Sequence, residues 1–347
     1  DLTFIRGLRN QSSAKLIAFG PAMRFVSEQV LGGAPVDAVL VGEAEGIFTV
    51  ALQRLEATKS LFPAQALTPE GAQAPGCDAQ GFVQDLDALP FPAWDVLPYA
   101  KYKLLTVLGS RGCPDHCTYC PYAAAQGHRF RARSVESVLA ELAWLDERFH
   151  PARLVFRDPV FAYDRERAVD ICEGILRRGL HLRWECESRP EHFNADLLRL
   201  MQRAGCQWVK VGLETTDETL LQRLRRVASA EQARAYLQHV ADLVRICGEI
   251  GLHCRLFVMA GLPGQDLGMA KRTRRFVEQL RPAALNVKQW QRYPGTELEA
   301  ATESDSEAQL GVLHQAQMAL ENRQHPPALL ARGKRWLKGI LRRGRYE

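Results

Sequence analysis

The chain has 347 residues, of which 46% are hydrophobic and 24% are charged. This composition is typical of globular proteins and argues against a disordered chain. No apolar run approaches the roughly 18 residues that cross a bilayer, which argues against a membrane-spanning protein. The 45 basic and 40 acidic residues are too evenly balanced to indicate a nucleic-acid partner, so we expect none.

The first 60 residues alternate between strand and helix patterns. Residues 14–19 and 36–41 are short apolar runs that suit strands, and residues 23–31 between them suit a helix. We therefore predict a partial Rossmann-like α/β domain over residues 1–60. Because Asp1 is followed at once by an apolar segment, we expect the first strands of this domain to be missing. Residues 61–100 are rich in proline and are predicted to be a linker.

The next 200 residues repeat a strand followed by a helix. Six strands are expected, at residues 104–108, 153–156, 182–185, 208–211, 254–259 and 284–288. Strands that alternate with helices form parallel sheets, and a barrel or partial barrel is the usual closure. The fold class predicted for residues 101–300 is therefore α/β, as a partial (βα)6 TIM-like barrel.

Several helix boundaries are signalled by capping residues. Ser134, Asn194 and Ser229 each stand directly before an apolar-periodic stretch, as N-caps do, and Gly205 is a stop signal. A further helix is expected to end at His325, which two prolines follow. We assign residues 301–347 to a helical C-terminal extension.

The last residues of the chain, "RGKRWLKGILRRGRYE", are strongly basic. Apolar residues recur among them at helical spacing, which predicts a short amphipathic helix. Such a helix either docks on the protein by its apolar stripe or contacts an anionic membrane surface or an acidic partner. Because no stretch is apolar enough to span a membrane, the expected location is the cytoplasm. The basic tail makes peripheral membrane contact the alternative.

Three cysteines lie within eight residues in "GSRGCPDHCTYCPY". Cys113, Cys117 and Cys120 have the spacing C-x3-C-x2-C, directly after a predicted strand, where active-site loops of parallel α/β folds lie. Three thiolates can ligate three irons of a four-iron cluster and leave the fourth iron open for chemistry. The alternatives are a structural zinc site or thiols that are neighbours by chance, but no second cysteine or histidine pair has zinc spacing.

The other cysteines are scattered through apolar stretches. The total of nine is odd, which favours reduced thiols with one metal cluster over a disulfide framework. Five are predicted to be inert core residues, namely Cys172, Cys186, Cys206, Cys247 and Cys254.

The cysteine motif, with Tyr119 in the aromatic position before Cys120, resembles that of the radical S-adenosylmethionine (SAM) superfamily. The stretches "VFRDPVFAYDRERA", "LLRLMQRAGCQWVKVGLETTDETLL", "FVMAGLPGQ" and "YPGTEL" resemble later segments of its barrel, so the resemblance covers about residues 104–298. It implies a [4Fe-4S] cluster on the three cysteines and SAM on the open iron. Electron transfer would then cleave SAM to methionine and a 5'-deoxyadenosyl radical.

The resemblance also indicates candidate cofactor contacts, of which Tyr119 is one. Glu214 could bind the SAM amino group or ribose hydroxyls, or it could cap the following helix. Arg189 and Arg255 could clamp the SAM carboxylate or form ion pairs at the core edge. Asp158 falls where relatives place polar residues near SAM or substrate, although Pro159 stands where they often have a second acid.

A glycine-rich turn supplies the remaining candidates. Gly261, Pro263 and Gly264 follow a predicted strand, and glycine there would let the backbone approach an adenine or ribose closely. The alternative is an ordinary tight turn.

The N-terminal stretch, centred on "VDAVLVGEAE", resembles the second half of the cobalamin-binding domain of one radical SAM subgroup. "DLDALPFPAWDVLPYAKY" resembles the linker of the same subgroup. The Asp-x-His-x-x-Gly signature of many cobalamin domains does not occur in the sequence. It could precede Asp1 in a longer protein, the chain could bind cobalamin without a lower histidine ligand, or it could have lost cobalamin.

The resemblance implies an enzyme that cleaves SAM for cobalamin-dependent methylation of an unactivated carbon. The alternatives are a rearrangement or cyclisation enzyme of the same subgroup, a methylthiotransferase, and a non-catalytic iron–sulfur or corrinoid binding protein. The expected partners are a small-molecule or lipid substrate and an external electron donor such as flavodoxin or ferredoxin.

Overall fold

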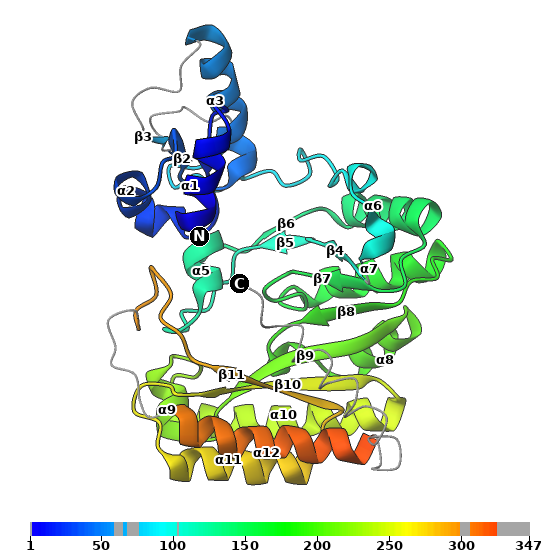
Figure 1. Cartoon of the computed structure of the whole chain (residues 1–347). Helices are drawn as coiled ribbons and strands as arrows, with labels where there is room; N and C mark the ends of the chain where they lie inside the picture. The colour runs from blue at the N-terminus through cyan, green and yellow to red at the C-terminus, as the bar shows by residue number, and fades with distance from the viewer. Residues whose placement is uncertain (1, 59–64, 68–75, 103, 299–305, 325–347) are drawn as a thin grey trace.

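The computed structural model describes residues 2–58, 65–67, 76–102, 104–298 and 306–324 (Figure 1). The basic tail predicted beyond residue 325 lies outside the described residues. No helix within the described ranges has the length and apolar character that a bilayer crossing requires.

A six-stranded parallel sheet is the centre of the fold, in the order β4-β7-β8-β9-β10-β11. Its strands are β4 (Leu105–Val107), β7 (Leu154–Phe156), β8 (Trp184–Glu187), β9 (Cys206–Glu214), β10 (His253–Ala260) and β11 (Ala284–Gln289). Each neighbouring pair is parallel, and β4 does not pair with β11, so the described strands form an open partial barrel. The six predicted strands are confirmed, with ends shifted by a few residues.

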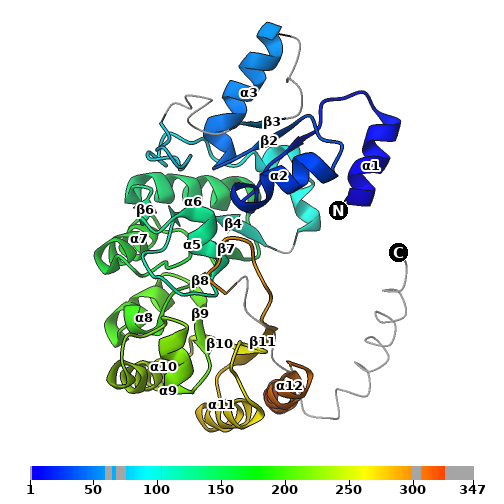
Figure 2. The same cartoon turned by 90° about the vertical axis from the view of Figure 1, so that its left-hand side faces the viewer.

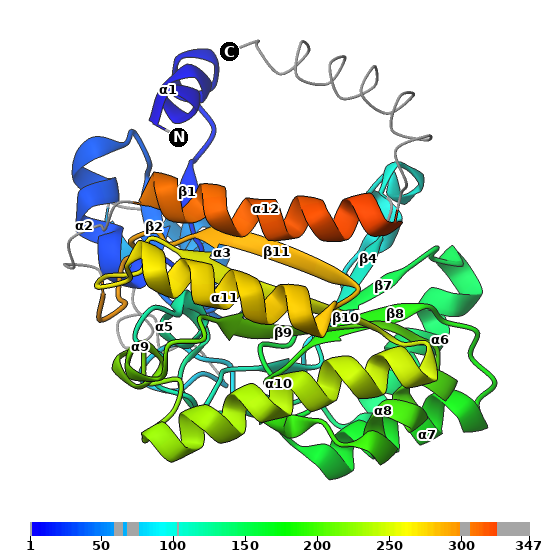
Figure 3. The same ribbon diagram turned by 90° about the horizontal axis from the view of Figure 1, so that it is seen from below.

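Helices cover the outer face of this sheet (Figures 1 and 3). They are α6 (Val135–Phe149), α7 (Arg165–Arg177), α8 (Ala195–Arg203), α10 (Ala230–Ile250), α11 (Leu267–Leu280) and α12 (Ser306–Gln324), while the short α9 (Glu218–Arg223) packs against α10. Short 3-10 helices lie at η1 (Trp94–Val96), η2 (Tyr99–Lys101) and η3 (Pro190–His192). The apolar faces of the α-helices and the strands of the sheet form one large core. This core includes all five cysteines that were predicted to be buried.

The capping signals act as predicted. The side chains of Ser134, Asn194 and Ser229 each accept a hydrogen bond from a backbone N–H of the first turn of α6, α8 and α10. Gly205 follows α8 with a φ of 92°, a left-handed conformation that glycine adopts without strain. Helix α12 is described as far as Gln324, and the predicted stop at His325 lies outside the described residues.

The N-terminal unit has a small parallel sheet in the order β1-β2-β3. Its elements are α1 (Leu2–Gln11), β1 (Ile17–Ala18), α2 (Met23–Gly33), β2 (Ala38–Leu40), α3 (Ala44–Thr58) and β3 (Gln65–Leu67). The two strands and the helix expected before residue 42 are present. Strand β3 falls in the range predicted as linker, but it pairs with β2 and therefore belongs to this sheet.

A short hairpin, which the sequence did not signal, carries the cysteine segment. Strand β5 (Ser110–Arg111) pairs antiparallel with β6 (Arg131–Ala132), and the loop between them contains the three cysteines and α5 (Pro121–Gln126). The N-terminal unit lies over this hairpin, at the β4 end of the large sheet (Figures 1 and 2).

Candidate active site

A cavity of about 440 Å³ lies between the cysteine loop and the inner face of the sheet. Cys113, Cys117 and Cys120 all line it. The opposite wall comes from the carboxyl-terminal parts of β8 to β11, where ligand sites of parallel α/β folds are found. The three thiols predicted to act together therefore share one cavity.

Strand β9 shows how the sheet builds this wall. Val209, Val211 and Leu213 are fully buried in the core beneath the helices. The residues between them, Lys210 and Gly212, line the cavity together with the strand's last residue, Glu214. Because side chains alternate across a strand, the stretch "VKVGLE" presents its apolar set to the core and its polar set to the cavity.

Glu214 and Tyr119 join the two walls of the cavity. The Tyr119 hydroxyl donates a hydrogen bond of 3.0 Å to Oε1 of Glu214. Glu214 has a φ of 62°, a left-handed conformation that is uncommon outside glycine, and a Cβ at Gly212 would lie 2.0 Å from its Oε1. Burial raises the pKa of Glu214, opposed by nearby Arg226 and by the tyrosine. The alternative that Glu214 caps the next helix is not what the structure shows, because Asp217 caps α9.

Arg189 lines the cavity, but its donors are already engaged. It pairs with Asp115 of the cysteine loop at 3.0 Å, and its Nε donates to Glu191 at 2.7 Å. Its Nη2 donates to the carbonyl of Arg226 at 2.6 Å. Of the two roles predicted for Arg189, the structure shows the ion-paired one, which holds the loop against the sheet.

Asp158, which was predicted to lie near SAM or substrate, is not among the residues that line the cavity. Its carboxylate is buried and accepts hydrogen bonds from the Gly109 N–H at 2.8 Å and the Ser110 hydroxyl at 2.6 Å. Burial raises its pKa, and the nearby Arg167 guanidinium opposes that shift. Asp158 therefore anchors the turn between β4 and the hairpin that carries the cysteines.

Arg255 also lies outside the cavity lining. It occupies the first half of β10, two and four residues before Phe257 and Met259, which do reach the cavity. Its guanidinium lies 4.7 Å from the centre of the Trp208 ring, a cation–π contact. The structure thus places Arg255 beside the cavity residues of β10 but outside the lining, and its contact with the SAM carboxylate stays a prediction.

The glycine-rich turn faces protein rather than the cavity. The Gly261 N–H donates to Gln309 of α12 at 2.9 Å, and a Cβ at Gly264 would lie 2.3 Å from the Arg223 guanidinium. Neither these glycines nor Pro263 lines the cavity. The backbone of this turn lies close to α12 and Arg223, and its approach to an adenine or ribose stays a prediction.

Arg226 and Lys210 are among the cavity residues that the sequence analysis did not identify. Arg226 lies 3.9 Å from the Cys117 sulfur through Nη1 and donates to the Gly212 carbonyl at 3.3 Å. It sits among other arginines in "LQRLRRVAS", and no local signal separates it from them. Lys210 is buried between Glu185 at 2.8 Å and Glu187 at 3.6 Å. A lysine inside an apolar strand is the signal that could have identified it.

The donor set fits a four-iron cluster better than a single ion. Within the described ranges, no group of three or more His, Cys, Asp or Glu side chains converges enough to hold one metal ion. A cubane takes each thiolate on a different iron, so its ligands need not meet at one point. Burial raises the pKa of Cys113 to about 12 and that of Cys120 to about 11, so ligation must release protons from these thiols.

The fold and the cavity define a partial parallel α/β barrel with three thiols on the loop after its first strand. The sequence profile of the Radical SAM superfamily matches residues 107–277, and the chain belongs to this superfamily. Membership implies a [4Fe-4S] cluster and SAM as cofactors, as the motif predicted.

Among curated proteins, an uncharacterized methyltransferase of Pyrococcus horikoshii is 29% identical over 80% of this chain and 61% of its own length. The hopanoid C-3 methylase of Methylococcus capsulatus is 25% identical over 80% of this chain and 53% of its own length. The chain thus spans little more than half the length of these relatives.

Among solved structures, the radical SAM methyltransferase TsrM from Kitasatospora setae, with cobalamin and a [4Fe-4S] cluster bound, matches with a TM-score of 0.67. It is 18% identical, and the match covers 86% of this chain and 61% of TsrM. This likeness extends beyond the barrel and confirms the fold.

Proposed function

We propose that the chain is the catalytic part of a radical SAM enzyme that methylates an unactivated carbon with the help of cobalamin. The observation that carries the proposal is that Cys113, Cys117 and Cys120 line one cavity against the inner face of the barrel. The superfamily match and the relatives named as methyltransferases support it.

The three cysteines would hold the cluster, and the polar residues of β9 would line the SAM site. When bound, the cluster supplies the electron that cleaves SAM. Glu214 offers a buried carboxylate suited to the SAM amino group or ribose hydroxyls. Arg226, close to Cys117, adds positive charge beside the thiolates, and Arg189 holds the loop through Asp115.

The N-terminal unit would be the remaining half of a cobalamin domain, followed by a linker, the barrel and the C-terminal extension. Its parallel sheet β1-β2-β3 and its position over the cysteine hairpin support this division. Cobalamin would supply a carrier for the methyl group, and the substrate would be a small molecule or lipid. An external donor such as flavodoxin or ferredoxin would supply the electron.

The test is the formation of 5'-deoxyadenosine by the anaerobically reconstituted protein with SAM and dithionite, quantified by mass spectrometry. Product is expected from the wild type and from Cys77→Ala, which removes a thiol outside the cavity, and not from Cys117→Ala. A wild-type protein that holds its cluster and forms no product would favour a non-catalytic binding protein. Full activity of Cys117→Ala would refute the ligand assignment.

Cobalamin use is tested separately by titrating the protein with hydroxocobalamin and following its absorption spectrum. Saturable binding is expected. If the protein forms 5'-deoxyadenosine but does not bind cobalamin, the proposal of SAM cleavage stands and the proposal of cobalamin-dependent methylation is overturned.

A further inference from the structure

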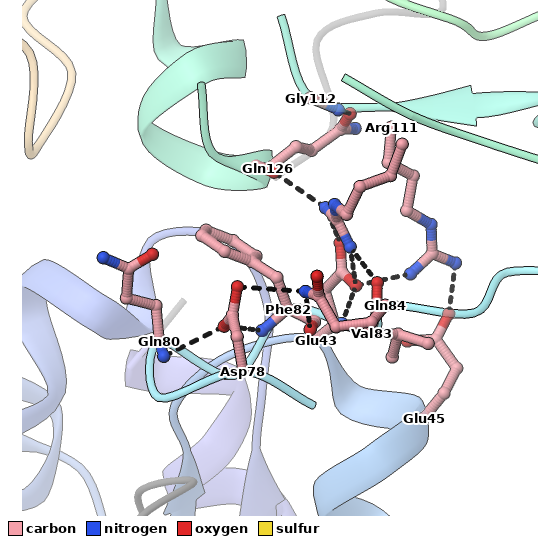
Figure 4. A network of polar contacts seen from close by, with 11 residues as sticks. Glu43, Glu45, Asp78, Gln80, Phe82, Val83, Gln84, Arg111, Gly112 and Gln126 are labelled. Carbon is pink, nitrogen blue, oxygen red and sulfur yellow. Dashed lines mark hydrogen bonds and ion pairs between the residues drawn. The ribbon is translucent and has the colours of Figure 1, made fainter. Parts of the chain in front are cut away.

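Glu43, a largely buried carboxylate of the N-terminal unit, contacts the cysteine hairpin (Figure 4). Glu43 lies in the turn between β2 and α3, and its side chain is 9% exposed. Its Oε1 and Oε2 accept hydrogen bonds of 2.8 and 2.9 Å from the two terminal nitrogens of Arg131 on β6. A forked pair of this kind fixes direction as well as distance.

Glu43 also joins two other segments to this pair. Its Oε2 accepts from the backbone N–H of Val83 at 2.8 Å and lies 3.1 Å from a guanidinium nitrogen of Arg111 on β5. The Val83 carbonyl in turn accepts a hydrogen bond from Arg131. The carboxylate therefore holds both strands of the hairpin and residue 83 at one point.

On the barrel side, the contacts lead from Arg131 to the first cysteine. Arg131 Nη2 donates to the carbonyl of Gln126 at the end of α5, at 2.8 Å. The side-chain Oε1 of Gln126 accepts from the Gly112 N–H at 3.1 Å, and the next N–H, that of Cys113, donates to Gly127 at 3.1 Å.

Gly112 shows how tightly this part of the loop is held. It has a φ of 80°, and a Cβ there would lie 2.1 Å from the carbonyl oxygen of Arg129. A side chain at residue 112 would therefore collide with the backbone of Arg129, and the hydrogen bonds of Gln126 and Arg131 lie next to this close contact.

We infer that Glu43 is a positioning residue for the cysteine loop: acting through Arg131 and Gln126, it fixes the backbone that carries Cys113. The inference rests on the proposed function, because it assigns Cys113 to a cluster. It gives the N-terminal unit a role in holding the cluster loop that does not depend on whether that unit binds cobalamin.

Glu45 provides a matched control two residues away. It pairs with the same hairpin through Arg111 at 2.6 Å, but its side chain is 43% exposed and it does not contact Arg131. Exposed pairs contribute little, whereas a buried carboxylate that loses its charge leaves its partner arginine uncompensated. Glu43→Gln and Glu45→Gln therefore make the same chemical change with different expected results.

The first measurement is hydrogen–deuterium exchange on the cluster-free protein. Glu43→Gln is expected to speed exchange in peptides containing Gly112 and Cys113 by about tenfold, because a hydrogen bond to a charged group is lost. Exchange in α8 is expected to stay unchanged. Glu45→Gln is expected to match the wild type. Wild-type exchange in Glu43→Gln, or equal effects of the two variants, would overturn the inference.

The second measurement is the rate of iron release to a chelator from the reconstituted protein. Release from Glu43→Gln is expected to be faster, again by about tenfold. Faster exchange with unchanged iron release would show a purely structural contact and would refute the positioning role. If the wild type holds no cluster, the proposed function fails, and the exchange data still decide whether Glu43 orders the loop.

Should Glu43→Gln fail to fold, Gln126→Ala is the substitute. It removes the acceptor of the Gly112 N–H and leaves the pair between Glu43 and Arg131 in place. Faster exchange at residues 112 and 113 is expected here too, and its absence would break the proposed chain of contacts.

Discussion

Tyr119, from the cysteine loop, donates a hydrogen bond of 3.0 Å to Glu214, the last residue of β9. The two residues are 95 positions apart in the sequence, and both line the cavity. This contact connects the loop that carries the three thiols to the wall opposite.

Tyr119→Phe should lower the free energy of unfolding by about 1–2 kcal/mol, because the buried Glu214 loses a donor while the ring packing is kept. Anaerobic urea unfolding of the cluster-free protein measures this. Tyr122→Phe is the control, since Tyr122 lines the same cavity, is 44% exposed and has no hydrogen-bond partner for its hydroxyl among the residues that the structure describes. Equal effects of the two changes would show that the contact with Glu214 contributes nothing.

Gly212→Ala should also destabilise the protein, because its Cβ would occupy the space of the Glu214 carboxylate. Gly248→Ala on α10, where no described residue lies within 4 Å of the new Cβ, should stabilise by about 0.5–1 kcal/mol. Gly212→Ala combined with Tyr119→Phe should cost less than the sum of both, since each disturbs the same hydrogen bond. Strict additivity would indicate that the methyl group is accommodated without moving Glu214.

Asp158→Asn should cost about 1–3 kcal/mol, because an amide turned toward Gly109 and Ser110 cannot accept from both donors. Thermal or urea unfolding measures the change. The matched control is Asp196→Asn, where the side chain is 95% exposed. A wild-type stability for Asp158→Asn would argue that the carboxylate does not hold the turn before the cysteine loop.

Thiol labelling should separate two classes of cysteine. Cys172, Cys186, Cys206, Cys247 and Cys254 are buried in the core and should react with iodoacetamide only on unfolding. Cys117 is partly exposed and should react in the folded, cluster-free protein and become protected on reconstitution. Mass spectrometry of labelled peptides reports both. Labelling of the core cysteines without denaturant would contradict the closed core.

Local patterns in the sequence determined much of the fold. Strand and helix periodicity gave the six strands of the barrel, because alternation at two and 3.6 residues reflects which side is buried. Ser134, Asn194 and Ser229 marked helix starts, since an N-cap is satisfied by its own first turn. Cys113, Cys117 and Cys120 likewise lie within one loop. Their spacing in the sequence was therefore enough to indicate a metal cluster.

Only the tertiary structure decided which side chains face that loop. Asp158 and Glu214 both stand at strand ends, yet one anchors a turn inside the core and the other lines the cavity. The pair of Glu43 with Arg131 spans 88 residues, and nothing near either residue indicates the other. Residues this far apart in the sequence meet because of how the N-terminal unit, the hairpin and the sheet pack together. Neither the periodicity of apolar residues nor the spacing of a motif encodes that packing.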